Sequence, residues 1–270
     1  MGVAVKSLEM MEWAPGDRVI ADPDSRRARA FLRSSEQVRA RFLRCRSAWE
    51  PHLGKAQRAI ERGIQRCSGR RTALILGGGM LHDVPLDTLA RCFERVVILD
   101  VVHLWRSVLA AKRYPNVTQA CVDLSGFIPA EESGGPSVGM PSGLLTFGRA
   151  DLVVSLNLMS QLAVVPRLEA GCEGHSEALD ILSRRMVLNH LSALNRVGGE
   201  VTLVTDIERW EIFPDGRKRS VGDILFGVNP GPFEEEWLWN IAPIPEAAPD
   251  YHVAHRVGVR HWTATGGEQS

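Results

Sequence analysis

The chain has 270 residues, of which 44% are hydrophobic, and its 32 lysines and arginines are balanced by 32 aspartates and glutamates. This length and apolar content suffice for one sizeable α/β core, and the zero formal net charge gives no global signal for nucleic acid or an acidic partner. The five cysteines are odd in number and have no CxxC spacing, which disfavours a disulfide framework or a zinc site.

The first residues carry no targeting signal that we recognise. They lack the apolar core of a signal peptide, and Lys6 stands where the myristoylation pattern requires Ser or Thr. No apolar stretch reaches the length that spans a bilayer. We therefore expect a soluble, cytoplasmic protein with no membrane partner.

Residues 1–70 are expected to form a helical cover. Apolar residues recur there at steps of seven and four, which is typical of an amphipathic helix. Pro51 is expected to divide this stretch and to lie in the first turn of the second helix. The apolar positions are Phe31, Val38, Phe42, Trp49, Leu53, Ile60 and Ile64.

Arginines are concentrated at the start of this stretch. Between Arg26 and Arg46 there are eight arginines and a single acid, Glu36. Such a face could bind phosphates, or its arginines could pair with acids elsewhere in this neutral chain. Few aromatic residues lie between the arginines, so nucleic acid stays an open partner that the pattern does not favour.

After residue 70, strand and helix patterns alternate, which predicts a mostly parallel sheet with helices on both faces. A helix starting at Pro85 with Asp83 as its cap, a second over 104–112 and a third over 176–197 are expected between the strands. Two late alternating segments, 237–241 and 252–262, indicate an antiparallel pair at the C-terminal edge. We expect a Rossmann-like seven-stranded α/β domain over 71–262, followed by a disordered tail over 263–270. The parallel strands are expected at 72–76, 95–99, 117–122, 151–156 and 200–205.

The turn after the first of these strands points to a nucleotide site. Gly77, Gly78 and Gly79 leave room for a ligand to approach the backbone, and Asp100 follows about twenty positions later, at the end of the second strand. An acid at this place can accept hydrogen bonds from a ribose. The spacing does not specify the nucleotide, and His82 stands where the strict dinucleotide fingerprint requires glycine.

Five parallel strands with a late antiparallel pair resemble the fold of class I S-adenosylmethionine-dependent methyltransferases over residues 70–262. The resemblance implies S-adenosyl-L-methionine as cofactor. Its amino-acid part would lie against the three glycines, its ribose at Asp100 beside Val101, and its adenine beside Asp123 and Leu124. The strand that ends near Ser155 would lead to the catalytic face.

The chain also departs from the family pattern. Ile75 occupies a place where the family often has an acid, and Leu81 stands where a third glycine is common. Helix entry is delayed by an insert over 80–83, and the link around 132–136 has little helical pattern. These departures leave open a non-catalytic nucleotide- or ligand-binding protein that retains the fold.

Residues for the acceptor are harder to identify, and no catalytic residue is assigned. Asn157 and Gln161 follow the fourth parallel strand and could orient an acceptor, or they could cap the following turn. No metal site is expected, because the histidines are isolated or fall on the predicted edge pair, where they are usually surface or core residues. These histidines are His82, His175, His190, His252, His255 and His261.

The sequence thus predicts methyl transfer to an unidentified, small-molecule acceptor. A nicotinamide-dependent oxidoreductase is a further alternative, against which His82 and the terminal antiparallel pair argue. The charged segment over 208–236 could form a lid. The acceptor, the pathway and the oligomeric state are not specified by the sequence.

Overall fold

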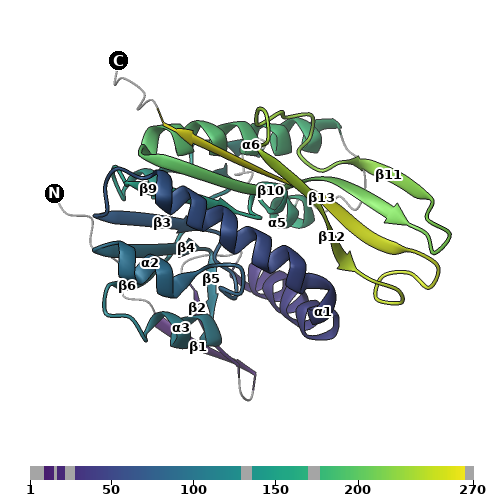
Figure 1. Cartoon of the computed structure of the whole chain (residues 1–270), viewed down its shortest axis with the longest axis horizontal. Helices are drawn as coiled ribbons and strands as arrows, with labels where there is room; N and C mark the ends of the chain where they lie inside the picture. The colour runs from purple at the N-terminus through teal and green to yellow at the C-terminus, as the bar shows by residue number, and fades with distance from the viewer. Residues whose placement is uncertain (1–8, 15–16, 22–27, 129–135, 170–176, 265–270) are drawn as a thin grey trace.

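The computed structural model describes residues 9–14, 17–21, 28–128, 136–169 and 177–264. Predictions that concern Lys6, Arg26, His175, the link over 132–135 and the tail over 265–270 fall outside them. Among the described residues, an eight-stranded sheet forms the centre of the molecule, with helices on both faces (Figure 1). Its strands are β3 (Thr72–Leu76), β4 (Arg95–Asp100), β6 (Val117–Cys121), β9 (Leu152–Leu156), β10 (Glu200–Ile212), β11 (Lys218–Asp223), β12 (Glu235–Ala242) and β13 (His252–Thr263).

The strand order is β12-β13-β10-β9-β3-β4-β6, and β11 pairs with the far end of β10. The strands from β6 to β10 are parallel, whereas β13 runs antiparallel to both β10 and β12. This is the architecture that the resemblance to class I methyltransferases implies, and the predicted fold class is confirmed. The chain moves outward from β3 to β6 and then returns to β9 on the other side of β3. In open α/β sheets, ligands bind at the carboxyl ends of the strands where the order reverses, which here is between β3 and β9.

Both faces of the sheet are covered by helices, so its central strands are apolar on both sides. On β3, Ile75 packs with α1 and α2, whereas its neighbour Leu74 packs with α4 and α6, and both side chains are fully buried. The predicted end of the third helix at residue 197 is confirmed, and Gly198 and Gly199, which follow it, both have positive φ. The helices are α1 (Ala28–Arg66), α2 (Leu86–Cys92), α3 (Trp105–Ala111), α4 (Ser142–Leu145), α5 (Val164–Glu169) and α6 (Glu177–Val197), with a 3-10 turn η1 (Met159–Gln161).

Helix α1 crosses one face of the sheet and is part of its core. Phe42, Trp49 and Ile60 are buried in the same cluster as the strands, as the apolar stripe predicts. The helix is interrupted at Cys45 (φ −109°, ψ 19°), and Pro51 lies inside the segment that continues. The division into two segments is therefore present, but the predicted position of Pro51 in the first turn of the second helix is wrong. Since proline has no N–H and its ring crowds the preceding turn, it disturbs the helix before it rather than at its own position.

The first described residues form strands rather than helix. β1 (Glu9–Ala14) and β2 (Asp17–Ala21) make a hairpin, and β2 pairs with β5 (Val102–Leu104), which follows β4 directly. The expected helical cover over 1–70 therefore also contains a β-hairpin. Short apolar and charged runs such as these do not distinguish strand from loop in the sequence. Between β6 and α4, the chain forms only the two-residue pair β7 (Phe127–Ile128) and β8 (Ser137–Val138) among the described residues.

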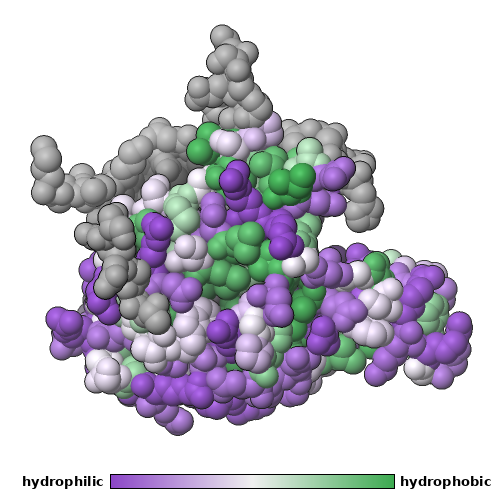
Figure 2. Space-filling view, turned by 90° about the horizontal axis from the view of Figure 1, so that it is seen from above, coloured by the Kyte–Doolittle hydropathy of each residue, from purple (hydrophilic) through white to green (hydrophobic). Residues whose placement is uncertain are grey.

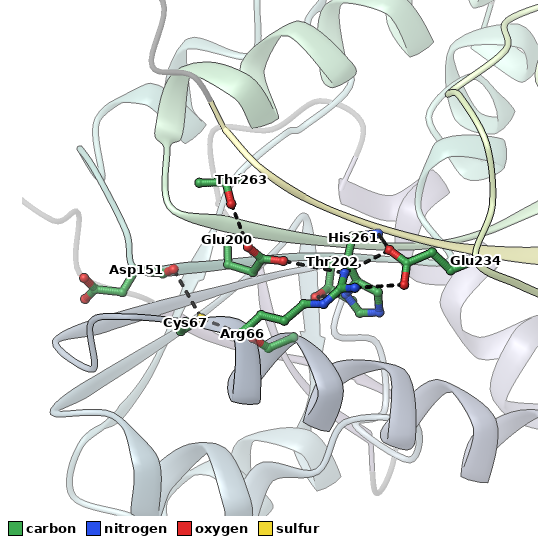
Figure 3. Close-up of polar contacts among 9 residues, drawn as sticks. Arg66, Cys67, Asp151, Glu200, Thr202, Glu234, His261 and Thr263 are labelled. Carbon is green, nitrogen blue, oxygen red and sulfur yellow. Dashed lines mark hydrogen bonds and ion pairs between the residues drawn. The ribbon is translucent and has the colours of Figure 1, made fainter.

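The end of α1 is attached to the sheet by a polar cluster (Figure 3). Arg66 donates to both carboxylate oxygens of Glu234, at 2.9 and 3.0 Å, and lies 3.9 Å from the buried carboxylate of Glu200. Next to it, the thiol of Cys67 donates to the backbone oxygen of Asp151 at 3.4 Å. Burial raises the pKa of Cys67 to about 11, so this thiol stays protonated and inert. The cluster anchors α1 at the end of the sheet opposite the ligand crevice.

Other arginines of α1 also attach the helix to the rest of the chain through ion pairs. Arg44 pairs with Glu246 at 2.7 Å, Arg41 lies 3.6 Å from the same carboxylate, and Arg62 pairs with Glu235 at 2.6 Å. Each of these pairs joins the helix to the C-terminal part of the chain. Within the arginine-rich stretch, Arg41 and Arg44 thus support the alternative of pairing with distant acids.

The segment over 208–236 is not a separate lid. β10 continues as a strand to Ile212 and turns into β11, and β12 begins at Glu235, so much of the segment extends the sheet. The side chains of β11 are exposed. This hairpin projects beyond the parallel strands at the right of Figure 1, and in Figure 2 the projecting arm is largely hydrophilic. Some of its charges lie on the exposed strand β11, whereas Glu234 and Glu235 pair with Arg66 and Arg62 of α1.

Candidate active site

A cavity of about 470 Å³ opens at the carboxyl ends of the parallel strands. This volume lies in the range of about 300–1,000 Å³ that is usual for small-molecule sites. The loops after β3, β4, β6 and β9 form one wall, and α1, β12 and β13 form the other. The cavity therefore lies where the strand order predicts a ligand site.

Two of the three glycines in the turn after β3, Gly77 and Gly78, are packed too closely to carry side chains. At Gly77 (φ +79°), an added Cβ would lie 2.8 Å from the backbone oxygen of Leu156, and at Gly78 it would lie 2.6 Å from a methyl carbon of Ile98. Gly79 also has positive φ (+48°), and a Cβ there would meet nothing within 4 Å. All three glycines line the cavity, and the last one leaves open space beside the backbone.

Asp100 is fixed by the turn it faces. One of its carboxylate oxygens accepts the Gly79 N–H at 3.0 Å, and the other accepts the Val101 N–H at 2.8 Å. The carboxylate also accepts the Val102 N–H, and Asp100 and Val101 both line the cavity. Burial raises the pKa of Asp100 and lowers that of the adjacent His103, which bonds the Ala120 carbonyl. His103 is therefore a neutral neighbour of this carboxylate.

Asp123 and Leu124 line the same cavity after β6. The Asp123 carboxylate accepts the backbone N–H and the hydroxyl of Ser125 at 2.8 and 2.6 Å, which orders the turn. Leu124 is buried and presents an apolar surface next to this turn. The two residues thus offer a carboxylate and an apolar contact side by side.

Asn157 follows β9 and has positive φ (+48°), an uncommon conformation for a residue with a side chain. Its Nδ2 donates to Asp83 at 3.0 Å and lies 3.2 Å from Nε2 of His52. Its Oδ1 is buried and has no hydrogen-bond partner among the described residues. Such an acceptor calls for a donor, and a ligand in the cavity could supply one.

The prediction that Asp83 caps the helix after the glycine turn is wrong. Helix α2 begins after Pro85 without a side-chain cap. Asp83 instead points its carboxylate to Asn157, and burial raises its pKa to about 6. Burial also lowers the pKa of the neighbouring His52 to about 3, so this ring is neutral.

The remaining predicted residues lie in different places. Gln161 lines the cavity and donates to the hydroxyl of Ser160 at 3.2 Å. Ser155 is not brought to the cavity: it is fully buried, and its hydroxyl lies 2.9 Å from Nε2 of His190 in the core on the α6 side. Burial lowers the pKa of His190 to about 4, so the pair is a neutral core contact.

Sequence reasoning missed a pair of residues in the cavity, Asp206 and His255. The Nδ1 of His255 lies 2.8 Å from one carboxylate oxygen of Asp206, and the other oxygen accepts the hydroxyl of Ser160 at 2.6 Å. The sequence places His255 only on the predicted edge pair, and the structure confirms that position in β13 and adds that His255 lines the cavity. The one signal in the sequence is the acid directly after the fifth parallel strand, a position where site residues gather.

Aromatic side chains form the opposite wall. Trp49 of α1 contacts Phe42 and Trp239 edge to face, with ring centroids 5.8 and 4.8 Å apart. His52 stacks on Trp239 at 3.9 Å, and the ring of His255 lies 6.2 Å from Trp239. The wall therefore runs from α1 across to the missed histidine.

No protein-family model matches the chain, and no curated protein matches it. Among solved structures, it is similar to DhpI in its complex with SAH (16% identity, 82% of this chain and 93% of that chain, TM-score 0.37). It is also similar to the Burkholderia thailandensis 1,6-didemethyltoxoflavin-N1-methyltransferase with bound S-adenosylhomocysteine (12% identity, 93% and 98% coverage, TM-score 0.38). A third match is to a chain in the complex between the Haloferax volcanii Trm112 methyltransferase activator and a methyltransferase (11% identity, TM-score 0.33). The match covers 58% of this chain and 55% of the matched chain. At these identities and scores the matches carry no argument about chemistry, which has to rest on the residues of the site.

Two further observations concern the described residues only. No helix among them is both long and apolar enough to cross a bilayer. Within the same ranges, no three histidine, cysteine, aspartate or glutamate side chains gather in a way that would hold a metal ion.

Proposed function

We propose that the chain is an S-adenosyl-L-methionine-dependent methyltransferase that acts on a small molecule. The observation that carries this proposal is the Asp100 carboxylate. It is held by the glycine turn and by the backbone N–H groups that follow it, at the end of the second parallel strand, and it lines the cavity. A carboxylate in this position is an acceptor-only group that suits the two hydroxyls of a ribose.

The rest of the cavity fits such a cofactor. The open space at Gly79 leaves room for its amino-acid part. The buried Oδ1 of Asn157 offers an acceptor for an ammonium group. Leu124 provides an apolar contact for the adenine, with Asp123 beside it. When bound, the cofactor supplies a methyl group on a positively charged sulfur. The chain's own task is then to hold the acceptor in line and to take up its proton.

The acceptor is proposed to be small because the cavity is limited in volume and mostly apolar. Cofactor and acceptor have to share about 470 Å³. Arg41 and Arg44 of α1 contact Glu246 rather than standing free for phosphates, which argues against a nucleic-acid acceptor. The polar groups that could orient a small acceptor are Asn157 and Gln161.

Calorimetry with S-adenosyl-L-methionine, S-adenosylhomocysteine and NAD tests this proposal. We expect the first two to bind in the micromolar range and NAD to bind far more weakly. Asp100→Ala should weaken cofactor binding by about 2–4 kcal/mol, because two charge-assisted hydrogen bonds are lost. Asp87→Ala is the matched control, since Asp87 is an exposed acid of α2 that pairs with Arg91 outside the cavity.

Two results would refute the proposal. If NAD bound more tightly than S-adenosyl-L-methionine, the cofactor would be a nicotinamide nucleotide and the proposal would be wrong. Unchanged cofactor affinity in Asp100→Ala, with a normal melting temperature, would reduce Asp100 to the end of a strand.

A further inference from the structure

Asp206 and His255 form a hydrogen-bonded chain that ends in the cavity. The Ser160 hydroxyl donates to one oxygen of Asp206, and the other oxygen lies 2.8 Å from Nδ1 of His255. The Asp206 side chain is 3% exposed and that of His255 is 15% exposed, so the carboxylate is shielded while the imidazole is accessible. Both residues line the cavity. Among the described residues, this carboxylate forms its ion pair with His255.

This arrangement fixes the tautomer of His255. A carboxylate at Nδ1 holds the proton on that nitrogen and leaves the lone pair on Nε2, the arrangement in which a histidine accepts a proton from a reactant. The carboxylate also stabilises the imidazolium that results. The other two histidines of this region lack such a partner. His52 has Trp237 and Asn157 at its two ring nitrogens, and His82 stacks on Phe42.

The charged and titratable groups around His255 come from several elements. Asp206 and Arg209 belong to β10, and Asp83 lies in the loop after β3. His52 of α1 is neutral because burial lowers its pKa to about 3. Within this set, the carboxylate in direct contact with the imidazole is that of Asp206. The pairing of β10 with β13 therefore determines that Asp206 is the carboxylate beside the His255 imidazole.

The wall beside His255 favours a flat, aromatic acceptor. The ring centroid of Trp49 lies 5.8 Å from that of Phe42 and 4.8 Å from that of Trp239. The ring centroids of Trp239 and His255 are 6.2 Å apart. Aromatic rings pack favourably against such edges and faces. An aromatic ring placed on this wall would carry a substituent toward His255.

We propose that His255 is the proton acceptor of this site, that Asp206 positions it, and that the acceptor is an aromatic hydroxyl compound. This inference rests on the proposed function. The phenolic O–H bond breaks, the proton goes to Nε2 of His255, and the electron pair stays on the oxygen as a phenolate. The phenolate is the nucleophile for an electrophilic methyl group, and the imidazolium later releases its proton to water.

The experiment uses 4-nitrophenol, whose phenolate absorbs visible light, with the full chain and with S-adenosylhomocysteine present or absent. The pH is held near the pKa of the free probe, where about half of it is ionised and an ordinary imidazole is mostly neutral, and we expect a larger ionised fraction of the bound probe. His255→Gln should bind the probe in its protonated form. Asp206→Asn should do the same, because an amide does not hold the required tautomer.

His252→Gln is the matched control. His252 lies on the same strand, its Nδ1 accepts the Ile244 N–H, and it is not among the residues that line the cavity. This variant should ionise the probe as the unmodified protein does. Melting temperature and S-adenosylhomocysteine affinity, measured for every variant, separate a loss of proton transfer from a loss of folding.

The outcomes separate this inference from the proposed function. A protein that binds S-adenosylhomocysteine but leaves the probe unbound or protonated overturns the inference alone. Ionisation that persists in folded His255→Gln overturns it as well, since another group then takes the proton. A protein that ionises the probe through His255 but does not bind S-adenosylhomocysteine refutes the proposed methyl transfer and supports the proton acceptor.

Discussion

Replacement of Asp83 by asparagine should stabilise the protein at neutral pH and leave it unchanged in mild acid. Burial raises the pKa of Asp83 from its ordinary value of 3.8 to about 6. The carboxylate is enclosed by the glycine loop and Asn157, with a neutral His52 nearby and no cation among its described contacts. The folded state therefore holds a proton that the unfolded state has already released.

The sign and size follow from this difference. Between about pH 4 and pH 6 the folded state binds more protons than the unfolded state, so stability falls as the pH rises through this window. A shift of about two units corresponds to about 3 kcal/mol lost by pH 7. Since Asp83 lines the cavity and is partly accessible, this is an upper value. In the Asp83→Asn variant the new side chain is neutral at every pH, and its amide oxygen could still accept from Asn157.

The assay is urea unfolding of both proteins between pH 4.5 and pH 7.5, with the difference in unfolding free energy followed against pH. All other groups titrate alike in the two proteins and cancel from the difference. We expect a gain for Asp83→Asn that grows through the window and levels off above it, whereas Asp87→Asn on the surface shows no such growth. A constant difference at all pH values would mean that Asp83 ionises in the folded state without penalty, and the reasoning would be wrong.

Three further predictions concern the fold and its surface. Gly78→Ala should lower the unfolding free energy by about 1–3 kcal/mol, because its methyl group would lie 2.6 Å from a buried carbon of Ile98; a melt of the variant checks this. A fragment that starts at residue 70 should aggregate in size-exclusion chromatography, because it lacks Phe42, Trp49 and Ile60, and a monomeric, ligand-binding fragment would contradict this. RNA binding should be weak and lost near physiological salt, as a filter-binding titration against salt would show; tight binding there would move the acceptor class to nucleic acid.

That the glycine turn and Asp100 line one end of the cavity could be predicted from the sequence, because the signals are local. The apolar run of β3, the glycines and Asp100 stand within thirty residues of one another, and each strand places its last residue at the same edge of the sheet. The register then brings Asp100 to the Gly79 N–H, as a parallel pair of adjacent strands must. At this end of the cavity, the spacing of the residues in the sequence is enough to predict that they lie close together in the fold.

The acceptor end could not be predicted, because it depends on contacts between distant segments. Asp206 and His255 are 49 positions apart and meet through the antiparallel register of β10 and β13, which is shifted by an irregularity between Asp206 and Glu208. A shift of one residue would turn either side chain to the other face of the sheet. The sequence pattern predicts the existence of the strands but not this register. The prediction for Asp83 is wrong for a similar reason, since its partner Asn157 lies 74 positions away.

The two ends of the cavity are formed by different parts of the chain. The loops after β3, β4 and β6 form the cofactor end, whereas α1 and the β12–β13 pair form the aromatic wall and position His255. The two ends meet in one cavity, yet they come from segments that the sheet order places on opposite sides of β9 and β10. Changes in Trp49 or Trp239 therefore reshape the acceptor end without touching the hydrogen bonds of Asp100. Under the proposed function, the helix that covers the sheet would shape the space left for an acceptor, and the parallel strands would hold the cofactor beside it.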